Sequence, residues 1–492
     1  MNDRIRAMEK IFSPRSIAFV GASNKRMKWG GIVFRNLRKG GYEGEIYPVN
    51  PGEQEIQGYK AYPDVSSIPA DVDLAIFTIP AHLVPEAISD CVRKGVGAGV
   101  VITAGFSELG PEGRVLQDEM IRRAKAGGMV LVGPNGQGIA VPENKLYPWL
   151  PIFRPAHGSV GIASQSGNVS TALAEQLAEL GFGCSKVISA GNCADLGWGD
   201  YLGYFAADPD TQVVLLYIEG IEDGRKFFES AKKASLAKPI VLLKGGRTEA
   251  GTRAAASHTG VMAGSDHVFS SLCRQAGIVR AETAEQAAIL AAAFVSTSLP
   301  AGRRLGIVTG GGGYGVLSAD AAAKRGLNLV RLSDATVEKL RKHLPPWWSP
   351  NNPVDMVGNL GAHGGPMDLI PILMESGEVD GVIFLSAGWL YNALDPVYAT
   401  RDFRESDRKD IQFLVDRDVD FCQKLADYAT SCDKPLLIHS PVARLAVRRR
   451  YPGLLRIIER RIVLYPEIDD AVQTFSLLAE RQAFLAREAR GG

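Results

Sequence analysis

The chain has 492 residues, which is enough for roughly three domains of about 150 residues each. Hydrophobic residues make up 46% of it and charged residues 22%, as is ordinary for a soluble globular protein. The formal net charge of +1 gives no overall field that favours nucleic acid or an anionic membrane, so neither is an expected partner.

The spacing of the cysteines and the length of the apolar runs exclude further classes of protein. None of the six cysteines forms a C-x-x-C pair, so the chain is expected to hold no metal and no redox motif. No apolar run reaches the roughly 20 residues of a membrane span. The segment 1–10 is polar and lacks the apolar core of a signal peptide. We therefore expect a cytoplasmic protein with reduced thiols.

The N-terminal part alternates short apolar runs with amphipathic stretches, which is typical of a parallel sheet covered by helices on both faces. The opening unit is a strand, then Gly21-Ala22-Ser23, then a helix, as in nucleotide-binding α/β domains. Its spacing is not G-x-G-x-x-G, so a dinucleotide fingerprint is absent. Strands are expected at 16–20, 45–49, 73–79, 99–103 and 129–132, and helices at 31–39, 81–94 and 111–126.

The turns after these strands are expected to meet, because the carboxyl ends of parallel strands share the edge where open α/β sheets bind ligands. Each residue taken singly is explained as an ordinary loop residue. A whole edge of small and rigid residues favours a nucleotide-like ligand. The residues expected there are Gly21, Ser23, Asn50, Pro51, Ile79, Pro80 and Asn135.

A stretch rich in proline and aromatic residues, 146–157, is interpreted as the linker into a second domain. That domain begins with a strand at 159–163, the turn Ser164-Gln165-Ser166-Gly167 and a helix. Two serine hydroxyls at a helix N-terminus are suited to a phosphate, and plain N-capping explains them equally well. Further strands are expected at 186–189, 212–218 and 239–243.

Small residues and glycines surround His258, so other groups can approach its imidazole closely. Such a histidine can carry a proton, bind a metal or act as a nucleophile, although a lone histidine in such a turn is usually structural. Glu219, Lys244 and Ser164 follow strands of the same predicted sheet, and we expect them near His258; the alternative for Lys244 is a plain surface lysine. A carboxylate bonded to one ring nitrogen fixes the tautomer and leaves the other nitrogen as nucleophile.

A third unit begins with a strand at 304–309, followed by Gly310 to Gly313 and a helix at 316–325. Successive glycines before a helix expose many amides to an anion. No Lys-Ser/Thr follows, so the segment is not a Walker A loop. Later strands are expected at 379–386, 435–439 and 462–465, with a final helix from about 467.

Together these motifs resemble the α-type subunit of the NDP-forming acyl-CoA synthetases, such as ADP-forming acetyl-CoA synthetase, which are relatives of succinyl-CoA synthetase. The resemblance runs from residue 11 to about residue 479, and the order and spacing of the motifs make it specific. The matching motifs are Val20-Gly21-Ala22-Ser23, Asn50-Pro51, Gly133-Pro134-Asn135, Ser164-Gln165-Ser166-Gly167, Tyr217-Ile218-Glu219-Gly220, Lys244-Gly245-Gly246, Ser257-His258-Thr259-Gly260, Gly310 to Gly313 and Asn352-Pro353-Val354-Asp355.

The resemblance implies three α/β domains. They are a Rossmann-like CoA-binding domain at 1–145, a flavodoxin-like, succinyl-CoA synthetase-like domain with the active histidine at 146–299, and a second flavodoxin-like ligase domain at 300–492. It implies that CoA binds with its diphosphate at the turn after the first strand. The implied CoA-binding residues are Gly21, Ala22, Ser23, Asn50, Pro51, Ile79, Pro80 and Asn135.

The resemblance also implies a reversible reaction of a small carboxylic acid, CoA and ATP to acyl-CoA, ADP and phosphate. His258 would be the phosphohistidine and Glu219 its orienting carboxylate. Two helix N-termini would hold the phosphate. The residues implied there are Ser164, Gln165, Ser166, Gly167, Gly311, Gly312 and Gly313.

Nothing in this chain resembles an ATP-grasp domain, which the family uses to bind ADP or ATP with Mg²⁺. We therefore expect a separate ATP-grasp β-type subunit and a hetero-oligomer. The alternative is a CoA-binding or CoA-sensing protein without catalysis, against which the presence of His258 and Glu219 counts. A dehydrogenase built on the first sheet is disfavoured by the missing glycine fingerprint.

Overall fold

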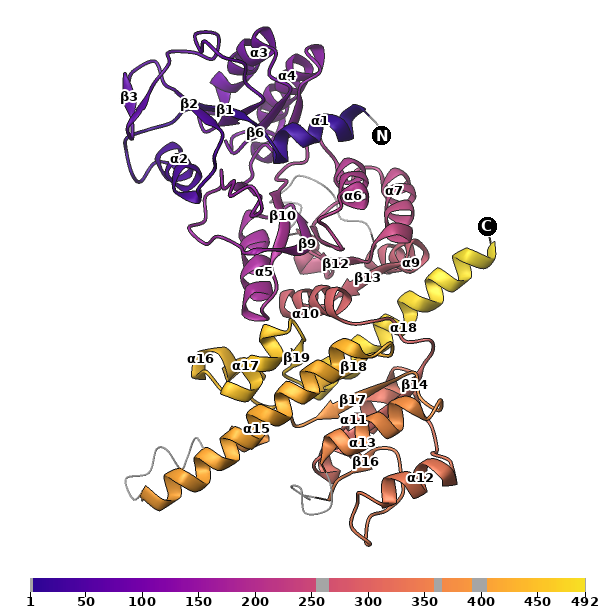
Figure 1. Ribbon diagram of the computed structural model, residues 1–492. Coiled ribbons are helices and arrows are strands. Elements are labelled where there is room, and N and C mark those ends of the chain that lie inside the picture. Colours follow the sequence, from indigo (N-terminus) through magenta and orange to yellow (C-terminus); the bar gives the residue numbers. More distant parts are fainter. Residues whose placement is uncertain (1–2, 254–264, 358–364, 392–404, 492) are drawn as a thin grey trace. The chain divides into compact units, whose positions relative to one another are not determined.

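The computed structural model describes residues 3–253, 265–357, 365–391 and 405–491 (Figure 1). The chain divides into two compact units. One consists of Met1–Ala178 and Phe182–Ala291, and the other of Glu179–Gly181 and Ala292–Gly492. In the described residues, the first unit holds two large sheets and a two-stranded hairpin, and the second unit holds a third large sheet.

The first sheet has the order β2-β1-β5-β6-β7, and all of its pairings are parallel. Its strands are β1 (Ser16–Val20), β2 (Glu45–Val49), β5 (Leu74–Phe77), β6 (Ala98–Val101) and β7 (Val130–Val132). Its helices are α1 (Asp3–Phe12), α2 (Trp29–Gly40), α3 (Val84–Lys94) and α4 (Pro111–Ala126), with short turns η1 (Ala81–Leu83) and η2 (Ser107–Leu109) and a hairpin of β3 (Glu55–Ile56) and β4 (Tyr59–Lys60).

Side chains of the first sheet alternate between two helix layers, as a pleated strand requires. Ile17 and Phe19 of β1 join the core that α1 and α2 build. Ala18 and Val20 of the same strand join the core of α3 and α4 on the other face. Burial on both faces explains why the strands are continuous apolar runs in the sequence.

The second sheet has the order β13-β12-β11-β9-β10-β8 and is parallel except for β8, which runs antiparallel to β10. Helices α6, α7 and α9 cover one face, and α5 lies on the other (Figure 1). Its strands are β8 (Gly138–Ala140), β9 (His157–Ser164), β10 (Cys184–Ser189), β11 (Val213–Ile218), β12 (Ile240–Lys244) and β13 (Ile278–Ala281). Its helices are α5 (Gly167–Glu179), α6 (Trp198–Ala207), α7 (Gly224–Ala237), α9 (Asp266–Ala276) and α10 (Ala284–Ser296).

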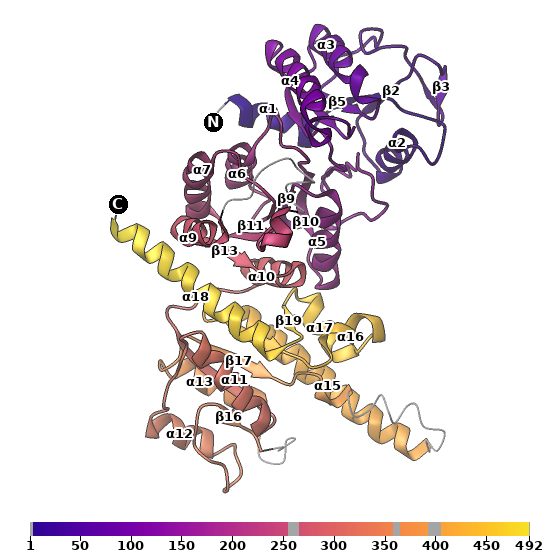
Figure 2. The same cartoon turned by 180° about the vertical axis from the view of Figure 1, so that it is seen from behind.

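The third sheet is parallel and has the order β15-β14-β17-β18-β19, with β16 also paired to β14. Helices α13, α15 and α17 share the core on one face, and α11 and α18 pack together on the other (Figure 2). Its strands are β14 (Arg304–Thr309), β15 (Asn328–Leu329), β16 (Val354–Asp355), β17 (Gly381–Leu385), β18 (Leu436–His439) and β19 (Leu464–Tyr465). Its helices are α11 (Gly312–Lys324), α12 (Asp334–Arg341), α13 (Pro366–Glu375), α15 (Glu405–Ser431), α16 (Ala443–Arg449), α17 (Pro452–Glu459) and α18 (Ile468–Gly491).

The predicted parallel α/β architecture is confirmed, whereas one helix boundary needs correction. The segment 146–157, predicted as a linker, is packed against the structure, because Trp149 is fully buried and the amide of Leu150 donates to the carbonyl of Gln137. Helix α11 begins at Gly312 rather than at residue 316, so two of the four glycines belong to its first turn. The domain limits of 1–145, 146–299 and 300–492 stay a prediction.

Phe475 of α18 fills the space that Gly381 of β17 leaves open: a Cβ at position 381 would lie 2.7 Å from the Phe475 ring. Because this ring is fully buried, we expect Phe475→Ala to destabilise the third sheet by about 3–5 kcal/mol. The matched control is Phe413→Ala on α15, where the ring is 61% exposed and the expected loss is below about 1 kcal/mol. Hydrogen exchange of the β17 and β18 amides measures both, and equal protection in the two variants would contradict this packing.

Candidate functional site

Hydrogen bonds tie the carboxyl ends of the first sheet into one edge. Asn50 Nδ2 donates to the carbonyl of Ala22 at 2.9 Å and joins the turns after β2 and β1. Thr103 Oγ1 donates to the carbonyl of Ile79 at 2.8 Å, and the amide of Asn135 donates to the carbonyl of Thr103 at 2.9 Å. The residues predicted to meet after β1, β2, β5 and β7 therefore do lie along one edge, where Pro51 and Pro80 are exposed.

The turn after β1 depends on a close approach between two stretches of backbone. Gly21 has a φ of +94°, a conformation that favours glycine. A Cβ on Gly30, at the start of α2, would lie only 2.0 Å from the carbonyl oxygen of Gly21. Thr78 Oγ1 donates to that same carbonyl at 3.2 Å, and Ser23 Oγ accepts the amide of Lys25 at 3.1 Å. The N-terminus of α2 is thus held directly against the turn, as an anion-binding turn requires.

The turn after β9 contains two kinds of residue. Some use their side chains in internal hydrogen bonds, and others stand at the start of the next helix. Ser164 is fully buried, and its hydroxyl donates to the carbonyl of Ser166 at 2.6 Å. Gln165 Oε1 accepts the amides of Glu219 at 2.5 Å and Gly220 at 3.1 Å, which ties the end of β9 to the end of β11. Ser166 Oγ accepts the amide of Val169 at 3.4 Å as an N-cap does. The hydroxyl of Ser164 is therefore used internally, whereas Ser166 and Gly167 stand at the start of α5.

Glu219 is buried at the carboxyl end of β11, with 7% of its surface exposed. The Tyr217 hydroxyl donates to its Oε1 at 3.1 Å, and Lys244 Nζ donates to its backbone carbonyl at 2.6 Å. Burial lowers the pKa of Lys244, although the Asp266 carboxylate opposes this. Burial raises the pKa of Tyr217, and the Glu219 carboxylate adds to the rise. Glu219 is therefore held in a poorly solvated place by hydrogen bonds on its side chain and its backbone.

The segment after β12 passes close to this carboxylate. A Cβ on Gly245 would lie 2.6 Å from the Tyr217 hydroxyl oxygen and 3.1 Å from Cγ of Glu219. Residues 249–253 then form a helical turn, and the Thr252 hydroxyl donates to the carbonyl of Gly246 at 3.1 Å. His258, the predicted phosphohistidine, lies outside the described residues.

The glycine run after β14 opens directly into α11. The Thr309 hydroxyl bonds both to the carbonyl of Gly311 at 2.9 Å and to its amide at 3.2 Å. The helix begins at Gly312, so the amides of its first turn have no partner within the helix. A Cβ on Gly312 would lie 3.1 Å from the Asp355 carboxylate, whereas Gly313 faces open space. The Asp355 carboxylate therefore already interacts with the positive end of the α11 dipole, which would attract an anion.

Sequence reasoning missed His439, which ends β18 at the same edge of the third sheet. Only 3% of this residue is exposed, and its Nδ1 accepts the amide of Ser386, 3.3 Å away at the end of β17. Ser386 has a φ of +81°, which is unusual for a residue other than glycine. Burial lowers the pKa of His439 to about 4, although Glu467 opposes this. The ring is therefore neutral near pH 7, with its proton on Nε2. The Tyr314 ring packs against it in a T-shaped arrangement, with the two ring centroids 5.6 Å apart.

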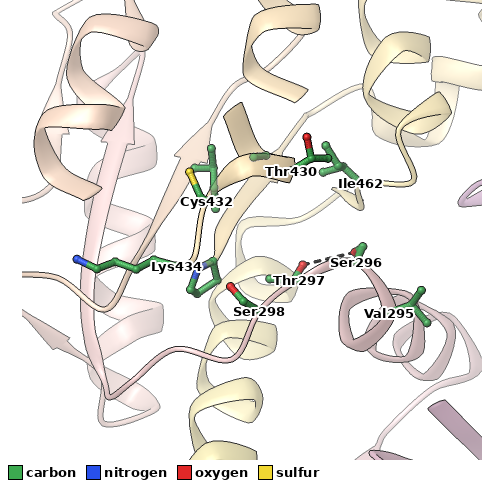
Figure 3. Close-up of a pocket in the computed structure, with 11 residues that line it drawn as sticks. Val295, Ser296, Thr297, Ser298, Thr430, Cys432, Lys434 and Ile462 are labelled. Atoms are coloured by element: carbon green, nitrogen blue, oxygen red, sulfur yellow. Dashed lines mark hydrogen bonds between the residues drawn. The ribbon is translucent and has the colours of Figure 1, made fainter. Parts of the chain in front are cut away.

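A pocket of 360 Å³ lies at the opposite end of the third sheet, before β18 begins (Figure 3). The hydroxyls of Ser296 and Thr297 are 3.4 Å apart in its wall. Lys434 directs its Nζ away from the cavity, to the carbonyl of Met374 at 2.6 Å. The pocket therefore lies at the amino ends of the strands, away from the edge that carries the motifs.

Among the described residues, no group of three or more histidine, cysteine or carboxylate side chains is arranged to hold a metal ion. All six cysteines are free thiols. In the described part of the chain, every helix is too short or too polar to cross a bilayer.

Models of known families match most of the chain. A CoA-binding domain matches residues 15–142, and a succinyl-CoA ligase-like flavodoxin domain matches residues 157–294. A ligase-CoA domain matches residues 305–366. The three matches follow one another in the order of the three sheets.

Comparison with individual proteins shows the same similarity. The chain is 43% identical over 353 residues to the α subunit of ADP-forming acetate–CoA ligase II from Pyrococcus furiosus, covering 72% of this chain and 76% of that one. It belongs to the family of NDP-forming acyl-CoA synthetases. An ADP-forming acetate–CoA ligase I from Archaeoglobus fulgidus is 40% identical over 376 residues, covering 76% of this chain and 54% of that longer one.

A solved structure resembles this synthetase chain over almost its whole length. It is an acetyl-coenzyme A synthetase 1 from Ca. Korarchaeum cryptofilum in complex with phosphate and ADP, with 32% identity, a TM-score of 0.80 and 98% of each chain covered. The predicted resemblance, the predicted fold and the assignment as an acid–thiol ligase are confirmed.

The buried imidazole of His439 predicts a dependence of stability on pH. Its folded-state pKa of about 4 lies below its ordinary value of 6.5, so the folded synthetase binds fewer protons than the unfolded chain between these values. This contribution to stability, at most about 3 kcal/mol, is present above pH 6.5 and is lost as the pH falls towards 4.

We therefore expect His439→Gln to lose less stability than the natural chain between about pH 7 and pH 4.5, as measured by urea-induced unfolding. The exposed His82, changed to Gln, serves as the control and is expected to behave as the natural chain does. An equal loss in His439→Gln and the natural chain would contradict the buried neutral ring.

Proposed function

We propose that this chain is the α subunit of an ADP-forming acyl-CoA synthetase in which His258 carries a phosphoryl group from an acyl phosphate to ADP. The observation that carries the proposal is the buried Glu219, whose Cγ lies beside Gly245 at the start of the segment that leads to His258. Burying a carboxylate costs free energy that hydrogen bonds and charge partners have to offset, so its position at the end of β11 is firmly set. An imidazole hydrogen-bonded to it has one fixed tautomer and a free nucleophilic nitrogen.

The reaction has three reversible steps. An oxygen of phosphate attacks the thioester carbonyl of acyl-CoA, the C–S bond breaks, and acyl phosphate and the CoA thiolate form. The free ring nitrogen of His258 then attacks phosphorus, the bond between phosphorus and the acyl oxygen breaks, and the carboxylate leaves. The terminal oxygen of ADP finally takes the phosphoryl group, which gives ATP and restores the imidazole.

The N-terminus of α5, which begins at Gly167 directly after the N-cap Ser166, supplies amides for the phosphoryl group in this proposal. The predicted phosphate-binding role of Gly311, Gly312 and Gly313 at the start of α11 stays a prediction. A phosphoryl group carries nearly two negative charges, which the free amides and the helix dipole stabilise. Ser164 and Gln165 act indirectly, since their side chains shape the turn and connect it to Glu219.

The match to a CoA-binding domain supports CoA as the thiol substrate. Its diphosphate would bind at the turn of Gly21, Ala22 and Ser23, where the N-terminus of α2 approaches the backbone closely. Asn50, Ile79 and Asn135 line the same edge with Pro51 and Pro80, and would position the rest of the molecule.

A second subunit completes the enzyme in this proposal. The Pyrococcus furiosus relative is named as an α subunit, and the Korarchaeum structure holds phosphate and ADP. ADP or ATP with Mg²⁺ would bind an ATP-grasp β-type partner, which makes the working enzyme a hetero-oligomer. The metal would neutralise charge on the nucleotide phosphates.

Labelling with radioactive ATP, Mg²⁺ and a β-type partner tests the proposal. We expect an acid-labile phosphate on this chain and none on His258→Ala, because a phosphoimidazole hydrolyses in acid. Label that persists on His258→Ala would overturn the assignment. Tight CoA binding without labelling or turnover would favour the alternative, a CoA sensor without catalysis.

Glu219→Gln isolates the contribution of the charge, because glutamine keeps a hydrogen-bonding side chain of the same size. We expect phosphorylation of the chain to slow by up to about 10⁴-fold while the fold is retained, as when an amide replaces the carboxylate beside a catalytic histidine. The matched control is Glu229→Gln on α7, where the side chain is 63% exposed and the rate is expected to stay unchanged. Rapid-quench labelling measures all three proteins, and equal rates for Glu219→Gln and the natural chain would show that the charge has no role.

A further inference from the structure

Gln137 lies between the two parts of the first unit that would hold the reactants, and the proposed reaction leaves its side chain without a role. It comes two residues after Asn135, at the edge proposed to bind CoA, and directly before β8. Its backbone amide donates to the Ser189 hydroxyl, 2.8 Å away at the end of β10. Gln137 is therefore fixed at the passage from the first sheet to the second.

The side chain of Gln137 lies across the first residue of α5. A Cβ on Gly167 would be only 2.2 Å from Cγ and 2.5 Å from Cδ of Gln137, so the glycine at position 167 makes this close approach possible. Gly167 begins the helix whose free amides are proposed to hold the phosphoryl group. The carboxamide of Gln137 therefore stands against the same helix N-terminus that the phosphate would approach.

Two hydrogen bonds fix the orientation of this carboxamide. Nε2 of Gln137 donates to Oδ1 of Asn168 at 2.7 Å, and the Thr171 hydroxyl donates to Oε1 of Gln137 at 3.4 Å. A carboxamide nitrogen carries two hydrogens, and in the described part of the chain only one of them has a partner. Because the side chain is only half-buried, the second N–H is available to a ligand.

We propose that the second N–H of Gln137 binds the carbonyl oxygen of the acyl group, which makes Gln137 a catalytic residue of the acyl transfer step. The inference rests on the proposed function, in which CoA binds along the first edge and phosphate at the start of α5. The thioester carbon then has to lie between the two, beside Gln137. When phosphate attacks this carbon, the carbonyl oxygen becomes an oxyanion until the C–S bond breaks and the thiolate leaves. A donor already fixed in place stabilises that charge without reorganisation.

This role concerns only one half of the reaction. In the direction of synthesis the CoA thiolate attacks the carbonyl carbon of acyl phosphate, the same oxyanion forms, and phosphate leaves. Transfer of the phosphoryl group between ATP and His258 makes and breaks bonds at phosphorus alone, so no oxyanion forms on carbon. Gln137 therefore contributes to acyl transfer and not to the loading of His258.

Two half-reactions of the full chain with a β-type partner separate this role from packing. One is labelling of the chain by radioactive ATP and Mg²⁺, and the other is formation of acyl-CoA from CoA and acetyl, butyryl or benzoyl phosphate. Gln137→Met keeps an unbranched side chain of similar size against Gly167 and removes both N–H groups. We expect natural labelling, and acyl-CoA formation at saturating CoA about 100- to 1,000-fold slower, as when one oxyanion donor is removed. Gln176→Met, the same change at a half-buried position further along α5, is the control and is expected to alter neither half-reaction.

Each other outcome overturns the inference in a recognisable way. Equal rates of acyl-CoA formation in Gln137→Met and the natural chain would remove Gln137 from the acyl transfer step, while the phosphohistidine would stand. Equal slowing of both half-reactions would reduce the effect to packing at the start of α5. Labelling of the natural chain without acyl-CoA from any of the three acyl phosphates would leave Gln137 no step to serve. Absence of both half-reactions in the natural chain would overturn the inference together with the proposed function.

Discussion

The chemistry proposed for this chain depends on keeping one carboxylate, that of Glu219, poorly solvated at the end of a central strand. Removing a carboxylate from water costs several kcal/mol unless hydrogen bonds replace the lost solvation. Here Tyr217 bonds the carboxylate, while Gln165 and Lys244 bond the backbone of the same residue. The geometry is thus fixed before any substrate binds, which is the condition for electrostatic preorganisation.

In each of the three large sheets, the strand topology gathers the carboxyl ends of the strands at one edge. Parallel strands that follow one another through crossover helices place all their carboxyl ends on one side, and the turns there are free to carry polar residues. In the first sheet these turns are joined through Asn50 and Thr103, in the second through Gln165, and in the third through the contact of Ser386 with His439. Side-chain hydrogen bonds between adjacent turns therefore convert separate loops into continuous surfaces.

The sequence predicted what depends on long apolar runs and on strand order. It did not predict features that depend on very short strands or on contacts between residues far apart in the sequence. Strands β8, β15 and β16 have only two or three residues, too few to show a strand pattern in the sequence. His439 ends an apolar strand, and nothing local shows that its ring accepts the Ser386 amide. The predicted role of Ser164 overlooked its internal bond to Ser166. The position of Gln137 against α5 is set by contacts that no local pattern in the sequence shows.

In the proposed enzyme, Glu219 fixes the tautomer of the imidazole that receives the phosphoryl group. Nitrogen-15 NMR of the histidine rings, with His258→Gln to assign the resonance, measures this tautomer directly. The account predicts a single tautomer for His258 in the natural chain and a mixture of both tautomers in Glu219→Gln, where the charge is lost. The same mixture of rapidly exchanging tautomers in both proteins would contradict it.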